Sequence, residues 1–213
     1  MKKYVLGFGA LVACAMGSVS APAMDLEILD PQIAQAFAQA LCESADAIEK
    51  PQVKIDPDLE KSCGVFMDVG EPVGLIIVPQ KDITPENEDV NKDPGAPLGH
   101  LFMSKGFAPV IDDKPIDDAK LRTITFAGQD GQEQKVSYLT LAARHTDDDV
   151  WHLYAYGTDE KPLLDLQIGE GVGPGTQPIA IEVKDVEDNS GTAFVTIFDM
   201  YQCSFKLNYK KPE

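Results

Sequence analysis

The chain has 213 residues, of which 44% are hydrophobic, and its 35 acidic and 18 basic residues give a formal net charge of −17. A chain of this length can bury a core without relying on disulfides, and the hydrophobic content predicts a folded protein rather than a disordered one. The negative charge argues against nucleic-acid binding, because the phosphate backbone would be repelled. No segment reaches the roughly 20 apolar residues that a transmembrane helix needs, so none is predicted.

Residues 1–23 have the features of an export signal. Two lysines precede an uncharged apolar stretch at 4–13, and small residues follow that stretch. Ala21-Pro22-Ala23 fits the A-x-A pattern cut by signal peptidase, and cleavage there would release a single β-rich domain spanning 24–213. Without Lys2 and Lys3 this domain has 16 basic and 35 acidic residues, a net charge of −19. We therefore predict a periplasmic or secreted protein.

A second cleavage site lies earlier in the same segment. Leu11-Val12-Ala13-Cys14 resembles a bacterial lipobox. The resemblance implies that Cys14 becomes an acylated N-terminus and that the protein is an outer-membrane lipoprotein. Release after Ala23 is the favoured prediction, and an acyl anchor through Cys14 stays open as the alternative.

One α-helix is predicted near the start of the domain, over about 31–49. Asp30 can cap the free N–H groups of its first turn, and Pro31 is tolerated at the first helical position. Apolar residues then recur at spacings of three and four, and Pro51 ends the pattern. One apolar face of this kind predicts a helix that packs on a sheet.

From residue 63 onward the sequence is typical of short strands separated by turns. Period-two alternation is clearest over 193–209, and Asp130-Gly131 is a strong hairpin signal. About ten strands without intervening helices predict a mainly β fold, an antiparallel β-sandwich or partly closed barrel with one N-terminal α-helix. The predicted strands are 63–69, 73–79, 98–104, 107–111, 121–127, 134–143, 150–156, 162–168, 179–186, 193–200 and 203–209.

Two loops interrupt the strand pattern. Residues 80–97 are mainly Asp, Glu, Asn, Lys and Pro, and a loop of this length is either functional or mobile. Residues 169–175 have glycine at every second position. They lack the G-x-G-x-x-G order of a dinucleotide site and no helix pattern follows them, so we interpret them as a flexible connection.

Cleavage after Ala23 leaves three cysteines, Cys42, Cys63 and Cys203. Thiols outside the cytoplasm tend to pair. A disulfide between Cys42 and Cys63, which would join the helix to the first strand, is the favoured prediction. Closing a loop of about 20 residues would contribute on the order of 3 kcal/mol. A disulfide between Cys63 and Cys203 is the alternative.

The histidines provide a candidate metal site. His145 and His152 flank an acidic turn that contains Asp147 and Asp149. With an even-numbered loop the two histidines would lie about 7–8 Å apart on one face of a hairpin. They could then bind a transition metal, with Asp147 or Asp149 as an oxygen ligand. A three-residue loop would put them on opposite faces.

Acidic clusters elsewhere, such as Asp112-Asp113, carry the oxygen ligands that Ca²⁺ prefers. Their spacing matches no known Ca²⁺ loop, so we interpret them as solvated turns. Beyond these candidate metals no cofactor is predicted.

Sequence motifs of the common catalytic sites are absent, including G-x-S-x-G, H-E-x-x-H and the Walker loop. The single tryptophan, Trp151, alternates with Leu153 and Ala155 and is interpreted as a core residue. We therefore predict an exported, non-catalytic binding or accessory module that contacts a protein, a glycan or a small ligand through its loops. The alternative is a secreted hydrolase or metal-binding protein that uses the acidic clusters or His145 and His152.

Overall fold

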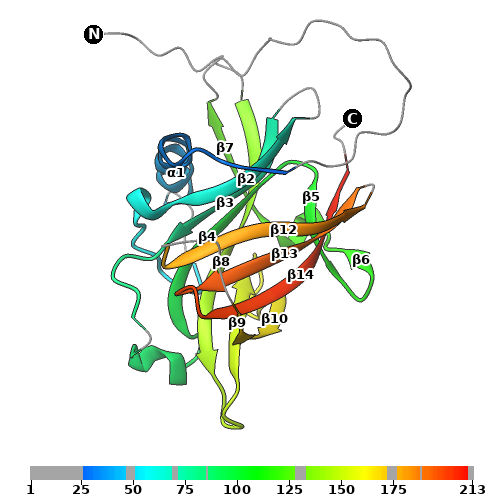
Figure 1. Ribbon diagram of the computed structural model, residues 1–213. Coiled ribbons are helices and arrows are strands. Elements are labelled where there is room, and N and C mark those ends of the chain that lie inside the picture. The colour runs from blue at the N-terminus through cyan, green and yellow to red at the C-terminus, as the bar shows by residue number, and fades with distance from the viewer. Residues whose placement is uncertain are drawn as a thin grey trace, which may run out of the picture.

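The computed structural model describes residues 26–46, 51–68, 72–84, 86–127, 133–171, 177–187 and 189–210. These residues form two antiparallel β-sheets and one α-helix (Figure 1). The predicted mainly β sandwich with one N-terminal helix is confirmed, and neither sheet closes into a barrel. The export signal, both of its cleavage sites and Cys14 lie outside the described residues. No helix in the described part of the chain is long and apolar enough to cross a membrane.

The larger sheet contains eight strands: β1 (Glu27–Ile28), β2 (Cys63–Asp68), β3 (Pro72–Pro79), β4 (Ala96–Ser104), β7 (Arg122–Ala127), β8 (Glu133–His145), β9 (Trp151–Tyr156) and β10 (Leu164–Gln167). Their order is β1-β2-β3-β4-β8-β9-β10. Strand β8 is long enough that its first half pairs with β7 and its second half with β9.

The smaller sheet contains six strands: β5 (Phe107–Ile111), β6 (Lys114–Pro115), β11 (Gly169–Glu170), β12 (Ile179–Glu187), β13 (Ser190–Ile197) and β14 (Tyr201–Tyr209). Their order is β12-β13-β14-β5-β6, and β11 pairs with the start of β14. A turn at 198–200 divides the alternation predicted over 193–209 into two strands. Because Ile197 pairs with Tyr201, the alternation keeps its phase, and Val195 and Cys203 still face the same core.

Each predicted strand range overlaps a strand of the structure. The strands that the sequence did not reveal, β1, β6 and β11, are two residues long.

The main hydrophobic core lies between the two sheets. Leu75 and Leu101 of the larger sheet and Ile179 and Val195 of the smaller one are fully buried there. Burying one such side chain contributes about 1.5–3 kcal/mol. Every second residue of each strand points inward, which is the period that a sandwich requires.

The helix α1 (Pro31–Ala45) covers the other face of the larger sheet (Figure 1). The carboxylate of Asp30 accepts hydrogen bonds from two backbone N–H groups of the first turn, as predicted. Leu41 packs against Phe102 of β4 in a second hydrophobic cluster. The larger sheet is therefore the middle layer of three. The helix was predicted to about residue 49, but it ends at Ala45, and 47–50 lie outside the described residues.

Short 3₁₀ helices occupy some of the connections: η1 (Leu59–Lys61), η2 (Glu88–Asn91) and η3 (Asp118–Lys120).

The predicted disulfide between Cys42 and Cys63 is not formed, and the three cysteines that the structure describes are free. Cys42 lies in the cluster between α1 and the larger sheet, whereas Cys63 packs against the core between the sheets. The larger sheet itself separates the two thiols. The alternative disulfide, between Cys63 and Cys203, is not formed either. The Cys63 thiol contacts the carbonyl of Ile179 on β12 at 3.5 Å. Cys203 lies on β14, two strands further across the smaller sheet.

Candidate functional site

One end of the sandwich gathers the loops that the sequence singled out (Figure 1). Strands β3 and β8 end there and β4 and β9 begin there, as their antiparallel registers require. We call this region the loop end. It comprises residues 80–84 and 86–95 between β3 and β4, 146–150 between β8 and β9, 168–171, and 198–200 between β13 and β14.

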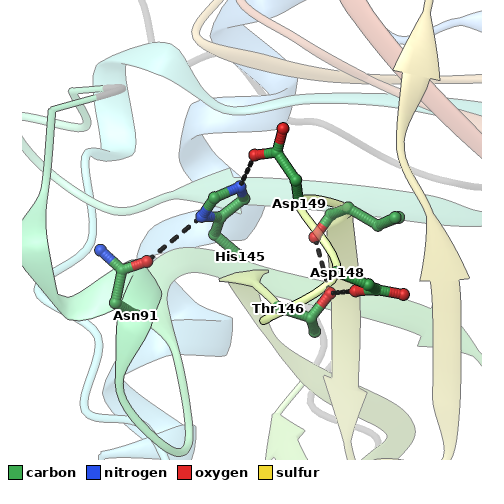
Figure 2. A network of polar contacts seen from close by, with 6 residues as sticks. Asn91, His145, Thr146, Asp148 and Asp149 are labelled. Carbon is green, nitrogen blue, oxygen red and sulfur yellow. Dashed lines mark hydrogen bonds and ion pairs between the residues drawn. The ribbon is translucent and has the colours of Figure 1, made fainter.

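His145, the last residue of β8, is fixed by polar contacts at both ring nitrogens (Figure 2). Its Nε2 lies 2.9 Å from a carboxylate oxygen of Asp149, and its Nδ1 lies 3.3 Å from the side-chain oxygen of Asn91 in η2. Its ring also lies against Trp151, with 4.8 Å between the ring centroids. Both ring nitrogens therefore contact side chains of the loop end, and these contacts hold the ring in place.

The turn at 146–150 has a backbone conformation that directs Asp149 back to His145. Asp149 has a φ of 63°, in the left-handed region that Asp tolerates better than most residues. The Thr146 hydroxyl donates a hydrogen bond to the Asp148 carboxylate and thereby lowers the pKa of Asp148. The Thr146 N–H donates to the carbonyl of Val150 at 3.0 Å.

His152 lies on the opposite face of the sheet from His145. The turn has five residues, so His145 pairs with Trp151 and Arg144 pairs with His152. Because side chains alternate along a strand, an odd-numbered loop places the two histidines on opposite faces. The His152 Nδ1 instead contacts Asp165 of β10.

The predicted metal site of His145, His152, Asp147 and Asp149 is therefore not assembled, because it required an even-numbered loop and the turn has five residues. Only Asp149 of the predicted partners approaches His145. Among the described residues no group of three or more His, Cys, Asp or Glu side chains could hold a metal ion.

Trp151 is not the core residue that its alternation predicted. It faces the same side of β9 as Leu153 and Ala155, which are buried, but it is the first residue of the strand and is 37% exposed. The end of the strand extends past the core, which the alternation alone does not reveal.

Five large hydrophobic side chains of the described residues are exposed, and three of them lie in or directly next to the loop end: Met200 within it, and Trp151 and Tyr201 as the first residues of β9 and β14. We call these three the apolar patch. The segment 168–171 joins them, because its Ile168 N–H donates to the carbonyl of Trp151 at 2.7 Å and its Gly171 N–H donates to that of Met200 at 2.9 Å. Tyr201 pairs with β11 in the same segment.

A cleft of about 450 Å³ opens at the 198–200 turn, where Phe198 and Asp199, the two residues before Met200, line it. Its lining includes Asp58, Lys61, Asp82, Gln177, Phe198 and Asp199. These residues come from four segments that are far apart in the sequence, and no motif joins them. Of the features noted in the sequence, only the acidic loop at 80–97 contributes residues to this region. Its first residues line the cleft, and its Asn91 contacts His145.

No family model, curated protein or solved structure matches the chain. Its function is therefore inferred from the geometry of the described residues.

Proposed function

We propose that the protein is an exported, non-catalytic binding module that contacts its ligand with the loop end of the sandwich. The observation that supports this proposal is the apolar patch, which lies where β9 and β14 begin and whose Met200 directly follows the cleft residue Asp199. Tryptophan, tyrosine and methionine are enriched at binding interfaces, and loops positioned by a scaffold often carry binding residues.

The side chain of Trp151 is already held in place before a ligand arrives. Its ring packs at a tilt against that of His145, which contacts Asp149 and Asn91 in turn. A ring fixed in this way loses less conformational freedom on binding, and this favours affinity. Tryptophan is also among the residues that most often dominate the binding energy of an interface.

The alternative function, a secreted hydrolase or a metal-binding protein that uses His145 and His152, gains no support from the geometry. The two histidines do not converge, and each one contacts a different aspartate.

A binding panel of glycans and peptides tests the proposal. We expect that Trp151→Ala or Tyr201→Ala weakens the binding of a selected ligand by about 2 kcal/mol, roughly 30-fold in Kd. Ile111→Ala is the matched control, because Ile111 is as exposed as Trp151 but belongs to β5 outside the loop end. Ligands that lose affinity with Ile111→Ala and keep it with the other two variants would place binding elsewhere. Chemical turnover of a bound ligand would show that the module is an enzyme.

A further inference from the structure

The two aromatic side chains of the apolar patch lie at one end of the main core, one on each sheet. Side chains two residues apart on a strand share a face of the sheet. Trp151 therefore points to the same side of β9 as Leu153, and Tyr201 to the same side of β14 as Cys203. Leu153 and Cys203 are both buried in the core between the sheets. The two aromatic rings thus border the same end of this core, and the segment 168–171 joins their strands.

Exposed carboxylates lie beside both rings. Glu170 of β11 is the register partner of Tyr201, so the two side chains lie next to each other on one face of the smaller sheet. Asp149 contacts His145, and the ring of His145 packs against Trp151 (Figure 2). The Asp149 side chain is 94% exposed, and Glu170 is exposed as well. Each ring therefore has a solvated negative charge nearby.

The loop end as a whole carries a negative charge. Its described segments contain ten acidic residues against two lysines. Both lysines already form ion pairs, Lys81 with Asp56 at 3.3 Å and Lys92 with Asp89 at 3.0 Å. Glu170 forms no ion pair within the described part of the chain. A positively charged partner would therefore meet carboxylates that the chain itself does not neutralise.

This combination of apolar and negative groups selects among the possible partners. Nucleic acids and anionic lipids would be repelled, and so would a second copy of the chain, whose net charge is also −17. A neutral glycan could stack on the rings but would gain nothing from the carboxylates. Arginine side chains suit both groups, because they bind carboxylates through charge-assisted hydrogen bonds and lie on the faces of tryptophan and tyrosine rings.

We infer that the apolar patch docks a basic segment of a partner protein, in which arginine or lysine residues flank apolar ones. The inference rests on the proposed binding function, because it names the partner of the same surface. Apolar side chains of the segment cover Trp151, Met200 and Tyr201, and its cations pair with Asp149 and Glu170. Complementary charge of this kind speeds association and disfavours other partners.

Trp151 can report its own burial, since it is the single tryptophan of the chain. The full chain is titrated with a short peptide of alternating arginine and leucine, at about 150 mM NaCl to limit unspecific charge attraction. We expect the emission of Trp151 to shift to shorter wavelength, because the ring leaves water. One control peptide has glutamate in place of arginine, and another has serine in place of leucine. Both are expected to bind at least about tenfold more weakly.

The double variant Asp149→Asn and Glu170→Gln tests the charged half of the surface. Asparagine tolerates the φ of 63° at Asp149, and its amide oxygen can still contact His145, so the turn is kept while two charges are lost. We expect the Kd of the arginine–leucine peptide to rise about tenfold, because two exposed ion pairs are lost.

The matched control is the double variant Asp185→Asn and Glu187→Gln. Both residues are exposed at the end of β12 that lies far from the loop end, and Asp185 also has a positive φ, 52°. The control removes the same charge from the chain. It is expected to change the Kd by less than about twofold, since charges far from the peptide are screened by salt.

Equal losses in the two double variants would show that the peptide meets only the overall negative charge, and the inference would be wrong. A larger emission shift with vesicles of neutral phospholipid than with the peptide would point to a lipid surface and would also overturn it. If the basic peptide fails to bind while a glycan binds in a way that depends on Trp151, the inference fails and the proposed function stands. If no ligand of the panel depends on Trp151 or Tyr201, both fail.

Discussion

At the scale of single residues, burial in the sandwich shifts the titration of His100 and of three thiols. His100 is buried between the rings of Phe102 and Tyr138, and its Nδ1 lies 3.4 Å from the hydroxyl of Thr140. Burial, and then the positive charge of Arg122, lower the pKa of His100 to about 4. The folded protein therefore holds this ring neutral in a pH range where the unfolded chain is protonated.

This lowered pKa predicts a loss of stability in mild acid. Above the unfolded pKa of 6.5 neither state binds the proton, and His100 adds no pH dependence. As the pH falls from 6.5 towards 4, only the unfolded chain takes up the proton, so the free energy of unfolding decreases by up to about 3 kcal/mol. Urea unfolding at about pH 7 and about pH 4.5 measures this decrease. We expect His100→Phe to show a smaller decrease than the wild type, and an equal decrease would rule out His100 as its source.

The free cysteines predict thiols that react slowly in the folded state. Burial, together with Asp46, raises the pKa of Cys42 to about 12, and burial raises those of Cys63 and Cys203 to about 11 and about 12. Only thiolates react rapidly with alkylating reagents. In a chain that carries Cys14→Ser, we expect no rapid labelling of the native protein and labelling of all three thiols after unfolding, as measured by mass. An unfolded, unreduced chain with one label would reveal a disulfide.

At the scale of elements, the start of α1 depends on its Asp30 cap. Removal of the carboxylate in Asp30→Ala leaves the N–H groups of Gln32 and Ile33 without their acceptor. Loss of an N-cap costs about 1 kcal/mol of stability, and Asn is nearly as good a cap as Asp. Chemical denaturation should therefore show the loss in Asp30→Ala and little of it in Asp30→Asn. An equal loss in both would mean that the charge of Asp30 matters more than its hydrogen bonds.

The sequence predicted elements whose signal is local. The cap at Asp30 and the alternation around Val195 depend on neighbouring residues alone, and both are found in the structure. The face of a strand after a turn depends on the number of residues in that turn. The sequence left this number open at 146–150, and the odd number found there places His145 and His152 on opposite faces.

The cleft and the true positions of the cysteines depend on tertiary packing, which no local pattern encodes. Gln177 and Asp199 line the same cleft because they flank the ends of β12 and β13, which pair with each other. Cys42 and Cys63 lie in the first elements of the domain, yet a sheet lies between them. The number of residues between two cysteines does not reveal on which face of a sheet each of them lies.

At the scale of the whole molecule, the remaining prediction concerns where the chain works. If the export signal is cut after Ala23, the intact mass of protein recovered from the periplasm should correspond to a chain that begins at Met24. An acylated chain that begins at Cys14, found with membranes and released from them in Cys14→Ser, would show the lipoprotein alternative instead. Uncleaved protein that stays in the cytoplasm of a bacterial host would contradict both forms of export.

The three-layer arrangement has a consequence for how the sequence can change over time. Strand β4 lies in the middle layer, and seven of its nine residues are buried because both faces are covered. Strand β14 lies in an outer layer, where buried residues alternate with more exposed ones. Relatives of this chain should therefore diverge slowly at nearly every position of β4, and at every second position of β14.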